Sequence, residues 1–246
     1  MGSELSFAGH KVLVVGGSSG IGNAIAVAFR DHGAEVCITG TRSQPEDYAG
    51  EDAVFSGMHY RQLDAANAAA VKSLSLPFDG LSILVNSQGC APEDSTAAVL
   101  DLDEFRRGLE VNLISVMQVC ARFHGELAAS KGSVVLIGSS ACFVAVPHRL
   151  GYSAAKGGLL TLTKSLASAW AADGIRVNGI APGYVATRMT RVRRSDPSRY
   201  QPTLNRIPMA RWGNPQEIAT VALFLASPLA SYVTGQMIAA DGGLTL

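Results

Sequence analysis

Lys11-Val-Leu-Val-Val15 runs directly into Gly16-Gly-Ser-Ser-Gly-Ile-Gly22, and this junction between an apolar run and a glycine-rich turn decides the fold class. The apolar run is typical of a strand that helices cover on both faces. Glycines allow positive φ, and without Cβ atoms they let the backbone approach a pyrophosphate at a helix N-terminus. A tight turn without a ligand is the alternative, which the position directly after the first strand disfavours. The phosphate-binding residues expected are Gly16, Ser18, Ser19, Gly20, Ile21 and Gly22.

The rest of the chain alternates short apolar runs with longer amphipathic ones. The expected strands are Lys11–Val15, Glu35–Thr39, His59–Leu63, Leu81–Asn86, Ser133–Gly138, Arg176–Ile180 and Gln236–Ala240. The expected helices are Gly20–His32, Ala65–Ser75, Asp103–Ala129, Tyr152–Ala172 and Pro215–Ser227. This alternation predicts an α/β fold, a doubly wound Rossmann-type sheet of seven parallel strands with helices on both faces.

Composition excludes several classes of protein. Twenty basic residues balance twenty acidic ones, which disfavours a nucleic-acid or anionic-membrane partner. With 48% hydrophobic residues, the chain can bury a sizeable core. The four cysteines lie far apart without zinc-site spacing, so we expect reduced thiols and no metal. No signal-peptide pattern or membrane-length apolar run is found in the sequence, so we expect a soluble cytoplasmic protein.

No repeat or linker divides the chain, and we expect one domain over residues 1–246. One segment, residues 187–211, departs from the alternating pattern. It holds seven arginines, and its prolines oppose a long helix. We expect this segment to be a substrate-binding lid. The arginines suit a carboxylate, a phosphate or an acyl-carrier surface, and a solvated, mobile cover is the alternative.

A candidate catalytic group lies in the second half of the chain. Tyr152 and Lys156 are four residues apart in a helical stretch, so they share one face. A neighbouring ammonium favours the phenolate, which lowers the Tyr152 pKa toward a range useful for acid/base catalysis. Ser139 follows the strand Ser133–Gly138, at the strand end where ligands of open α/β sheets bind. Tyr-x-x-x-Lys alone occurs often by chance, and an ordinary helix start is the alternative interpretation. The presence of Ser139 at a strand end and of the glycine-rich turn in the same chain favours the catalytic interpretation.

These motifs, in this order, resemble the short-chain dehydrogenase/reductases of single-domain type, over almost the whole chain. The resemblance rests on Gly16…Gly20-Ile21-Gly22, Asn86…Gly89, Asn112, Ser139/Tyr152/Lys156, Pro182-Gly183 with Thr187, and the C-terminal Asp241-Gly242-Gly243. It implies an NAD(P)-dependent oxidoreductase acting on a carbonyl or secondary alcohol of 3-oxoacyl, polyol, sugar or ketone type. A sugar epimerase or dehydratase and a non-catalytic cofactor-binding protein are the alternatives. The first of these is generally longer, and the second would lack Tyr152 or Lys156.

The resemblance also implies roles for single residues. Tyr152 would exchange the proton with the substrate oxygen, Ser139 would orient that oxygen, and Asn112 would hold a water in a proton relay. Lys156 would bind the nicotinamide ribose and lower the Tyr152 pKa. Further cofactor contacts would come from Asp64, Asn86, Gly89, Pro182, Gly183, Val185 and Thr187. A homotetramer or homodimer would form through Asn112–Ala129 and Tyr152–Ala172.

The chain departs from the family pattern at two places. Val15 stands where a threonine hydroxyl usually braces the glycine turn, and Asn86-Ser-Gln-Gly89 replaces the usual Asn-Asn-Ala-Gly. We expect the bracing to come from elsewhere and cofactor binding to survive.

The choice of cofactor depends on the end of the second strand, which reads Gly40-Thr41-Arg42. Gly40 lies where a carboxylate would bind the ribose 2′-OH of NAD, whereas Arg42 can pair with a 2′-phosphate. We therefore favour NADP and leave NAD open, because Arg42 can also be a solvated loop residue. Substrate specificity should come from Ala141–Gly151 and from residues 187–211, with His148 and Tyr184 as candidate contacts.

Overall fold

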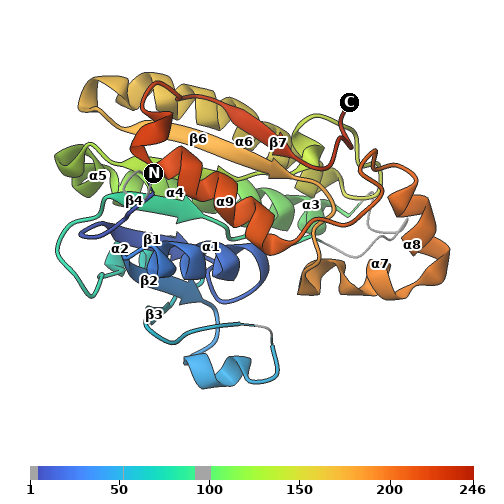
Figure 1. Ribbon diagram of the computed structural model, residues 1–246, viewed down its shortest axis with the longest axis horizontal. Coiled ribbons are helices and arrows are strands. Elements are labelled where there is room, and N and C mark those ends of the chain that lie inside the picture. Colours follow the sequence, from blue (N-terminus) through green and yellow to red (C-terminus); the bar gives the residue numbers. More distant parts are fainter. Residues whose placement is uncertain (1–4, 52, 92–100) are drawn as a thin grey trace.

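The computed structural model describes residues 5–51, 53–91 and 101–246, and its centre is a seven-stranded parallel sheet (Figure 1). The strands are β1 (Lys11–Val15), β2 (Glu35–Gly40), β3 (His59–Gln62), β4 (Ile83–Asn86), β5 (Ser133–Ile137), β6 (Arg176–Pro182) and β7 (Met237–Ala240). Their order is β3-β2-β1-β4-β5-β6-β7. The order reverses between β1 and β4, so the ligand crevice of such a sheet lies at the C-terminal ends of these two strands. All expected strands are confirmed, with ends shifted by at most two residues.

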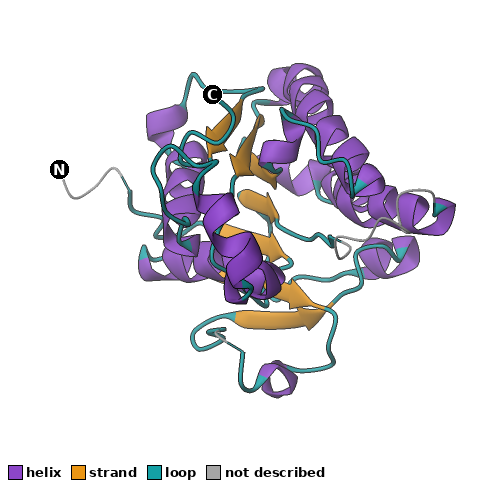
Figure 2. Cartoon of the chain, turned by 90° about the vertical axis from the view of Figure 1, so that its right-hand side faces the viewer, coloured by secondary structure: helices purple, strands orange, loops and turns teal. Residues whose placement is uncertain are grey.

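Helices cover both faces of the sheet, as Figure 2 shows edge-on. The α-helices are α1 (Gly20–Asp31), α2 (Ala68–Ser73), α3 (Leu102–Leu109), α4 (Ser115–Arg122), α5 (His124–Ser130), α6 (Leu150–Trp170), α7 (Arg191–Ser195), α8 (Pro197–Leu204) and α9 (Pro215–Ala226). In β1, Val12 and Val14 pack in the core layer of α1 and α9, whereas Leu13 and Val15 pack in the layer of α2, α4 and α6. Alternate residues thus face opposite layers, which explains the unbroken apolar pattern.

The expectation of one continuous helix over Asp103–Ala129 is wrong. The segment divides into α3, a π-helical turn (η3, Glu110–Ile114), α4 and α5, with Phe123 between the last two. The π turn places Asn112 in the interior, where it is fully buried. The second helix is also shorter than expected, because Asn67 caps its N-terminus by accepting from the N–H groups of Ala69 and Ala70.

The segment 187–211 forms a short 3-10 turn (η6, Arg188–Thr190), α7 and α8, which lie beyond one end of the sheet in Figure 1. Pro197 occupies the first turn of α8, where a missing N–H has no cost, and Asp196 caps that turn. The prolines thus allow two short helices in place of a long one. Within the described part of the chain, no helix is both long and apolar enough to cross a bilayer.

Candidate active site

The glycine-rich turn has the shape that a pyrophosphate requires. Gly16 and Gly20 have φ values of +75° and +53°, which side chains rarely allow. A Cβ on Gly16 would lie 2.7 Å from the backbone nitrogen of Gln88, so only glycine fits. Helix α1 starts at Gly20, its N-cap Ser19 makes no side-chain capping bond, and its first turn carries no acidic residue. Its first N–H groups therefore remain available to an anion, and the turn fits a dinucleotide phosphate.

Thr39 on β2 supplies the bracing that Val15 cannot. Its hydroxyl accepts a hydrogen bond of 3.2 Å from the Gly16 N–H, and Thr39 is 1% exposed. On the other side, the Ser87 N–H donates to the Val15 carbonyl at 2.9 Å. The expectation that the turn is held from elsewhere is confirmed, and the replacement comes from the next strand of the sheet.

Ser139, Tyr152 and Lys156 come together at the C-terminal end of β5. Ser139 lies two residues beyond the end of the strand and caps a 3-10 turn (η4, Ser140–Cys142), and its hydroxyl bonds the Tyr152 phenol. Lys156 is buried one turn further along α6, with Nζ 5.7 Å from the Tyr152 ring centroid. The Nζ donates to the Ile137 carbonyl oxygen at 2.8 Å, which fixes the ammonium beside the strand end. The three residues predicted as catalytic are therefore neighbours.

The electrostatics of this group differ from the sequence expectation. Burial raises the pKa of Tyr152, although the Ser139 hydroxyl and the charge of Arg149 act in the opposite direction. Burial also lowers the pKa of Lys156, to about 8. The expectation of a lowered Tyr152 pKa is wrong in this structure, because desolvation of the phenolate outweighs the neighbouring positive charge. Tyr152 is thus a protonated phenol at neutral pH.

Asn112 braces the loop after β4. Its Nδ2 donates to the carbonyl oxygens of Cys90 and Gly108, both at 2.9 Å, and its Oδ1 accepts from the Cys90 N–H at 3.2 Å. A Cβ on Gly89 would lie 2.9 Å from Asn112 Oδ1 and 3.8 Å from Lys156 Nζ. The predicted residues Gly89, Asn112 and Lys156 therefore meet beside the catalytic group. π-helical turns often mark functional sites, and this one turns Asn112 toward the loop.

The end of β2 holds two residues that sequence reasoning missed. The space where a Gly40 side chain would stand contains the Tyr48 hydroxyl and the Ser18 side chain. Tyr48 belongs to a 3-10 turn (η1, Pro45–Tyr48), and the Arg42 guanidinium lies 4.5 Å from its ring centroid. Arg42 Nη2 donates to Glu51 Oε1 at 2.5 Å. Tyr48 and Glu51 thus surround Gly40 and Arg42 at the end of β2.

The other predicted cofactor residues lie around the same crevice. Asn86 is buried at the end of β4 and accepts from Gln88 Nε2 at 3.2 Å. Pro182 ends β6, and the Thr187 methyl group lies against Gly20, 3.3 Å from where a Cβ would stand. Val185 is 3% exposed. Asp64 follows β3 as an exposed residue, and its carboxylate accepts from the Ala66 N–H.

The two segments predicted to contact the substrate are Ala141–Gly151 and residues 187–211, and their substrate contacts remain predictions. His148 is exposed and has no resolved role. Tyr184 packs edge-on against Trp212, and Trp212 stacks with Tyr200 of α8, so an aromatic cluster supports this segment. Arg149, three residues before Tyr152, was not singled out by the sequence analysis, yet its charge acts on the Tyr152 phenol.

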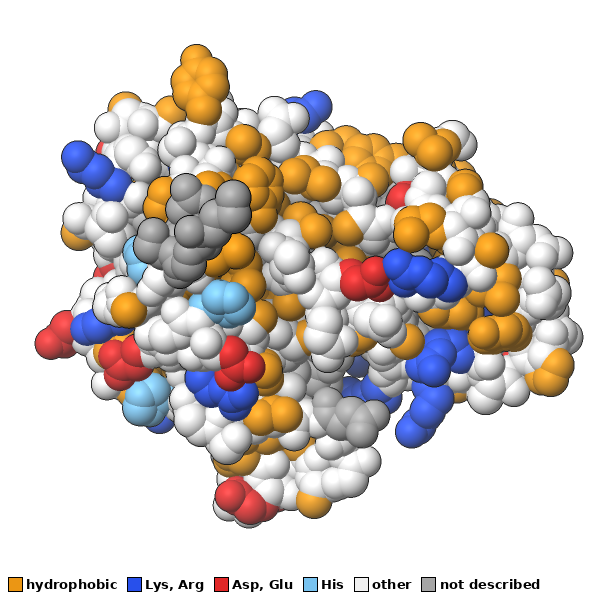
Figure 3. All heavy atoms as spheres, in the orientation of Figure 1, with side chains coloured by type: hydrophobic (Ala, Val, Ile, Leu, Met, Phe, Trp, Pro, Cys, Tyr) orange, Lys and Arg blue, Asp and Glu red, His pale blue; other side chains and the backbone are white. Residues whose placement is uncertain are grey.

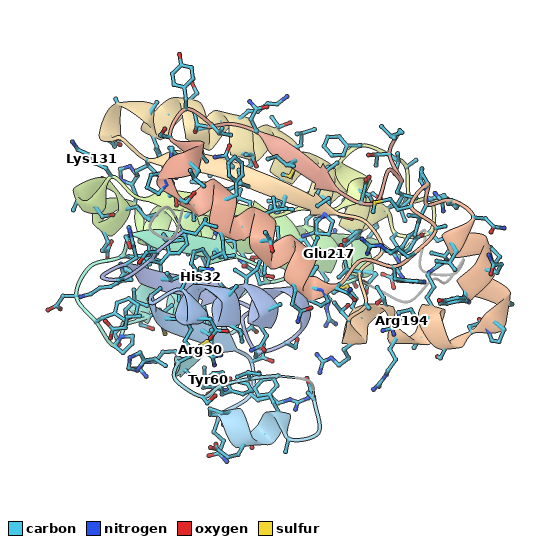
Figure 4. All side chains as sticks on the ribbon, viewed as in Figure 1. Arg30, His32, Tyr60, Lys131, Arg194 and Glu217 are labelled. Atoms are coloured by element: carbon cyan, nitrogen blue, oxygen red, sulfur yellow. The ribbon has the colours of Figure 1, made fainter. Side chains whose placement is uncertain are left out.

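Basic side chains gather at the end of the molecule that carries α7, as Figure 3 shows. Arg194 lies on α7 in Figure 4, and Glu217 lies in the first turn of α9. Glu217 pairs with Arg211 at 2.6 Å, which lowers the Glu217 pKa to about 2. Among the described residues, a cavity of about 340 Å³ lies beside this segment, lined by residues that include Tyr184, Met209 and Asp241. Neither Ser139 nor Tyr152 lines that cavity.

Comparison with known proteins decides the family. The model of the family described as enoyl-(acyl carrier protein) reductase matches residues 15–245. The chain is a short-chain dehydrogenase/reductase. This enzyme is 38% identical to galactitol 2-dehydrogenase (L-tagatose-forming) from Cereibacter sphaeroides, over 97% of its own chain and 96% of the relative. It is 34% identical to a 3-oxoacyl-(acyl-carrier-protein) reductase from Chlamydia pneumoniae, over 98% and 99% of the two chains.

Its fold matches solved structures of the same family. One is a protein from Agrobacterium tumefaciens proposed to be a 2-deoxy-D-gluconate 3-dehydrogenase, solved with bound NADP. The TM-score is 0.87 and the identity 37%, over 98% of both chains. The short-chain dehydrogenase/reductase described here is therefore an NAD(P)-dependent oxidoreductase that transfers hydride between a nicotinamide and a carbonyl or secondary alcohol.

Proposed function

We propose that this enzyme uses NADP to interconvert a secondary alcohol and a ketone in a small polyhydroxylated substrate, a polyol or a sugar acid, in the cytoplasm. The observation that carries the proposal is the pairing of the Ser139 and Tyr152 hydroxyls beside Lys156, with the charge of Arg149 also acting on the Tyr152 phenol. Two neighbouring hydroxyls can both hydrogen-bond to one carbonyl or alcohol oxygen of a substrate, and one of them can exchange a proton with it. A guanidinium nearby suits further oxygens or a carboxylate on the same molecule.

The cofactor side of the proposal uses the residues around β1, β2 and β6. The N–H groups at Gly16–Gly22 would hold the pyrophosphate, and Arg42 would pair with the 2′-phosphate. Lys156 and Thr187 would bind the nicotinamide ribose and carboxamide. When bound, the nicotinamide supplies or accepts the hydride.

The chain's own residues would handle the proton. The Ser139 hydroxyl would orient the substrate oxygen, and the Tyr152 phenol would donate its proton to that oxygen during reduction and take it back during oxidation. Because burial raises the Tyr152 pKa, the phenol carries its proton at neutral pH and is ready as a donor. Asn112 would position the loop at Cys90, through its three hydrogen bonds there and at Gly108, so that Lys156 keeps its place.

Two observations favour a polyol or sugar acid over a 3-oxoacyl thioester. Arg149 lies three residues before Tyr152, and its charge acts on the Tyr152 phenol. A carboxylate or several hydroxyls within a few bonds of the reacting carbon would use that charge. Of the three relatives named above, one acts on galactitol and one is proposed to act on 2-deoxy-D-gluconate, which supports the same class, whereas the third is a 3-oxoacyl-(acyl-carrier-protein) reductase.

A substrate panel tests the proposal. The purified enzyme is mixed with NADP+ and either galactitol or gluconate, and separately with NADPH and a 3-oxoacyl thioester, while NADPH absorbance is followed. We expect turnover with the polyol or the sugar acid. Arg149→Gln should raise KM for the acid by about tenfold, as the loss of one charge-assisted hydrogen bond would, with a smaller effect on kcat. Turnover of the thioester alone would contradict the proposed substrate class.

We also propose a homotetramer or homodimer that uses α4 and α6. Ile114, the N-cap of α4, and Met117 within α4 are 43% and 39% exposed, so they could contribute apolar contacts to such an interface. Light scattering on the purified enzyme measures the assembly, and a monomer at micromolar concentration would refute it.

A further inference from the structure

Glu51 joins two arginines from opposite sides of the cofactor crevice. Its Oε1 accepts from Arg42 Nη2 at 2.5 Å and from Arg188 Nη1 at 2.6 Å. Arg42 follows β2, whereas Arg188 follows Thr187, the residue that contacts Gly20 of the glycine turn. One carboxylate oxygen therefore holds two guanidinium groups that come from segments more than 140 residues apart in the sequence.

These two guanidinium groups meet at Glu51 near the end of β2, where the sequence predicts that the adenosine ribose of the cofactor binds. Arg42 is fixed by three contacts, since it also lies on the Tyr48 ring and donates to the Asp47 carbonyl. Gly40 contributes no carboxylate, and the space beside it is filled by Tyr48 and Ser18. Glu51 is the carboxylate that both arginines contact, and its side chain is 16% exposed. A bound phosphate would have to share or take over the same donors.

The Glu51 carboxylate is only half satisfied. Among the residues that the structure describes, its Oε2 is buried and has no hydrogen-bond partner. A buried carboxylate oxygen without a donor destabilises the arrangement, because it has lost water and gained nothing in return. Glu51 therefore depends on the two arginines through Oε1 alone, so it competes with a dianion for them, and a dianion beside an unmoved Glu51 would be repelled.

We propose that Glu51 is a specificity-determining residue for the cofactor, an internal anion that occupies Arg42 and Arg188 and competes with the 2′-phosphate of NADP. Arg188 is then a second phosphate-binding residue, contributed by the lid segment. NAD, which has no phosphate at this position, does not compete with Glu51. The carboxylate thus reduces the preference for NADP that the two arginines would otherwise give. The inference rests on the proposed use of Arg42 for NADP.

Equilibrium binding tests the proposal without turnover. The dissociation constants of NADPH and NADH are measured by nucleotide fluorescence for the wild type and for Glu51→Gln. We expect roughly tenfold tighter NADPH binding by Glu51→Gln, as removal of one like charge beside a phosphate implies, with NADH binding changed by less than about twofold. Unchanged or weaker NADPH binding would overturn the proposal. Weaker NADH binding would also overturn it, because Glu51 would then be the acceptor of the ribose 2′-OH.

A second pair of variants keeps the test independent of Glu51 itself. Arg188→Gln should weaken NADPH binding and leave NADH binding unchanged, whereas Arg191→Gln should change neither. Arg191 is an exposed arginine three residues further along the same segment. Equal effects of Arg188→Gln on both nucleotides would refute a phosphate contact. If the wild type itself binds NADH more tightly than NADPH, the proposed preference for NADP is wrong. The change in NADPH binding caused by Glu51→Gln still tests separately whether Glu51 competes with the 2′-phosphate.

Discussion

Replacing Lys156 with methionine should make the protein more stable while removing its activity. Lys156 is 4% exposed, and burial lowers its pKa from 10.5 to about 8. Each pKa unit corresponds to about 1.4 kcal/mol, so the charged lysine costs the native state about 3 kcal/mol at neutral pH. Methionine fills a similar volume without charge but loses the hydrogen bond to the Ile137 carbonyl, a loss of about 1 kcal/mol. The net gain of about 2 kcal/mol should raise Tm by about 4 to 8 °C for a chain of this size.

The pH dependence of stability distinguishes the removal of a buried charge from improved packing by the methionine side chain. Between about pH 8 and 10.5 the unfolded chain holds the Lys156 proton and the native protein does not. The free energy of unfolding of the wild type therefore rises between these pH values relative to that of Lys156→Met, and the difference in stability between the two proteins disappears. Unfolding of both proteins is followed by circular dichroism from neutral to alkaline pH, with Lys164→Met, an exposed lysine of α6, as the control. A variant less stable than the wild type at neutral pH, or a gap independent of pH, would refute the reasoning.

Two further predictions concern the cofactor side. Gly40→Asp should lower Tm and weaken the binding of NADPH and NADH alike, because the Tyr48 hydroxyl and the Ser18 side chain fill the space that the new carboxylate needs. Combining Gly40→Asp with Tyr48→Phe removes that hydroxyl, so the double variant should shift the ratio of the two dissociation constants toward NADH. A shift toward NADH by Gly40→Asp alone would show that Tyr48 gives way. Thr39→Val removes the acceptor of the Gly16 N–H and should weaken both nucleotides by about fivefold, equivalent to about 1 kcal/mol. An effect on one nucleotide only would contradict a bracing role.

The fold could be predicted because its signals are local. The apolar run Lys11–Val15 has no polar alternation, and the structure shows why, since neighbouring residues of β1 face two different helix layers. The glycine turn needs positive φ at Gly16 and Gly20 and no Cβ beside the loop after β4. Ser139, Tyr152 and Lys156 could be grouped because a strand end and a helix face follow directly from their spacing.

The features that escaped prediction depend on contacts between distant segments. Tyr48 and Glu51 belong to a loop without periodicity, and only the fold brings them to Gly40, Arg42 and Arg188. The π turn at Asn112 inserts one residue into a helical pattern, which hydrophobic spacing does not reveal. The raised pKa of Tyr152 comes from burial, a property of the packed protein and not of the four-residue spacing.

Tyr152→Phe tests the central claim most directly. The rate of NADPH oxidation with the best ketone substrate and the dissociation constant of NADPH are measured together for the wild type, for Tyr152→Phe and for Tyr232→Phe, whose ring is fully exposed. If Tyr152 donates the proton, its variant should lose a factor of about 100 or more in turnover while NADPH binding changes by less than about twofold, and Tyr232→Phe should match the wild type. A Tyr152→Phe enzyme that turns over at the wild-type rate would contradict the account.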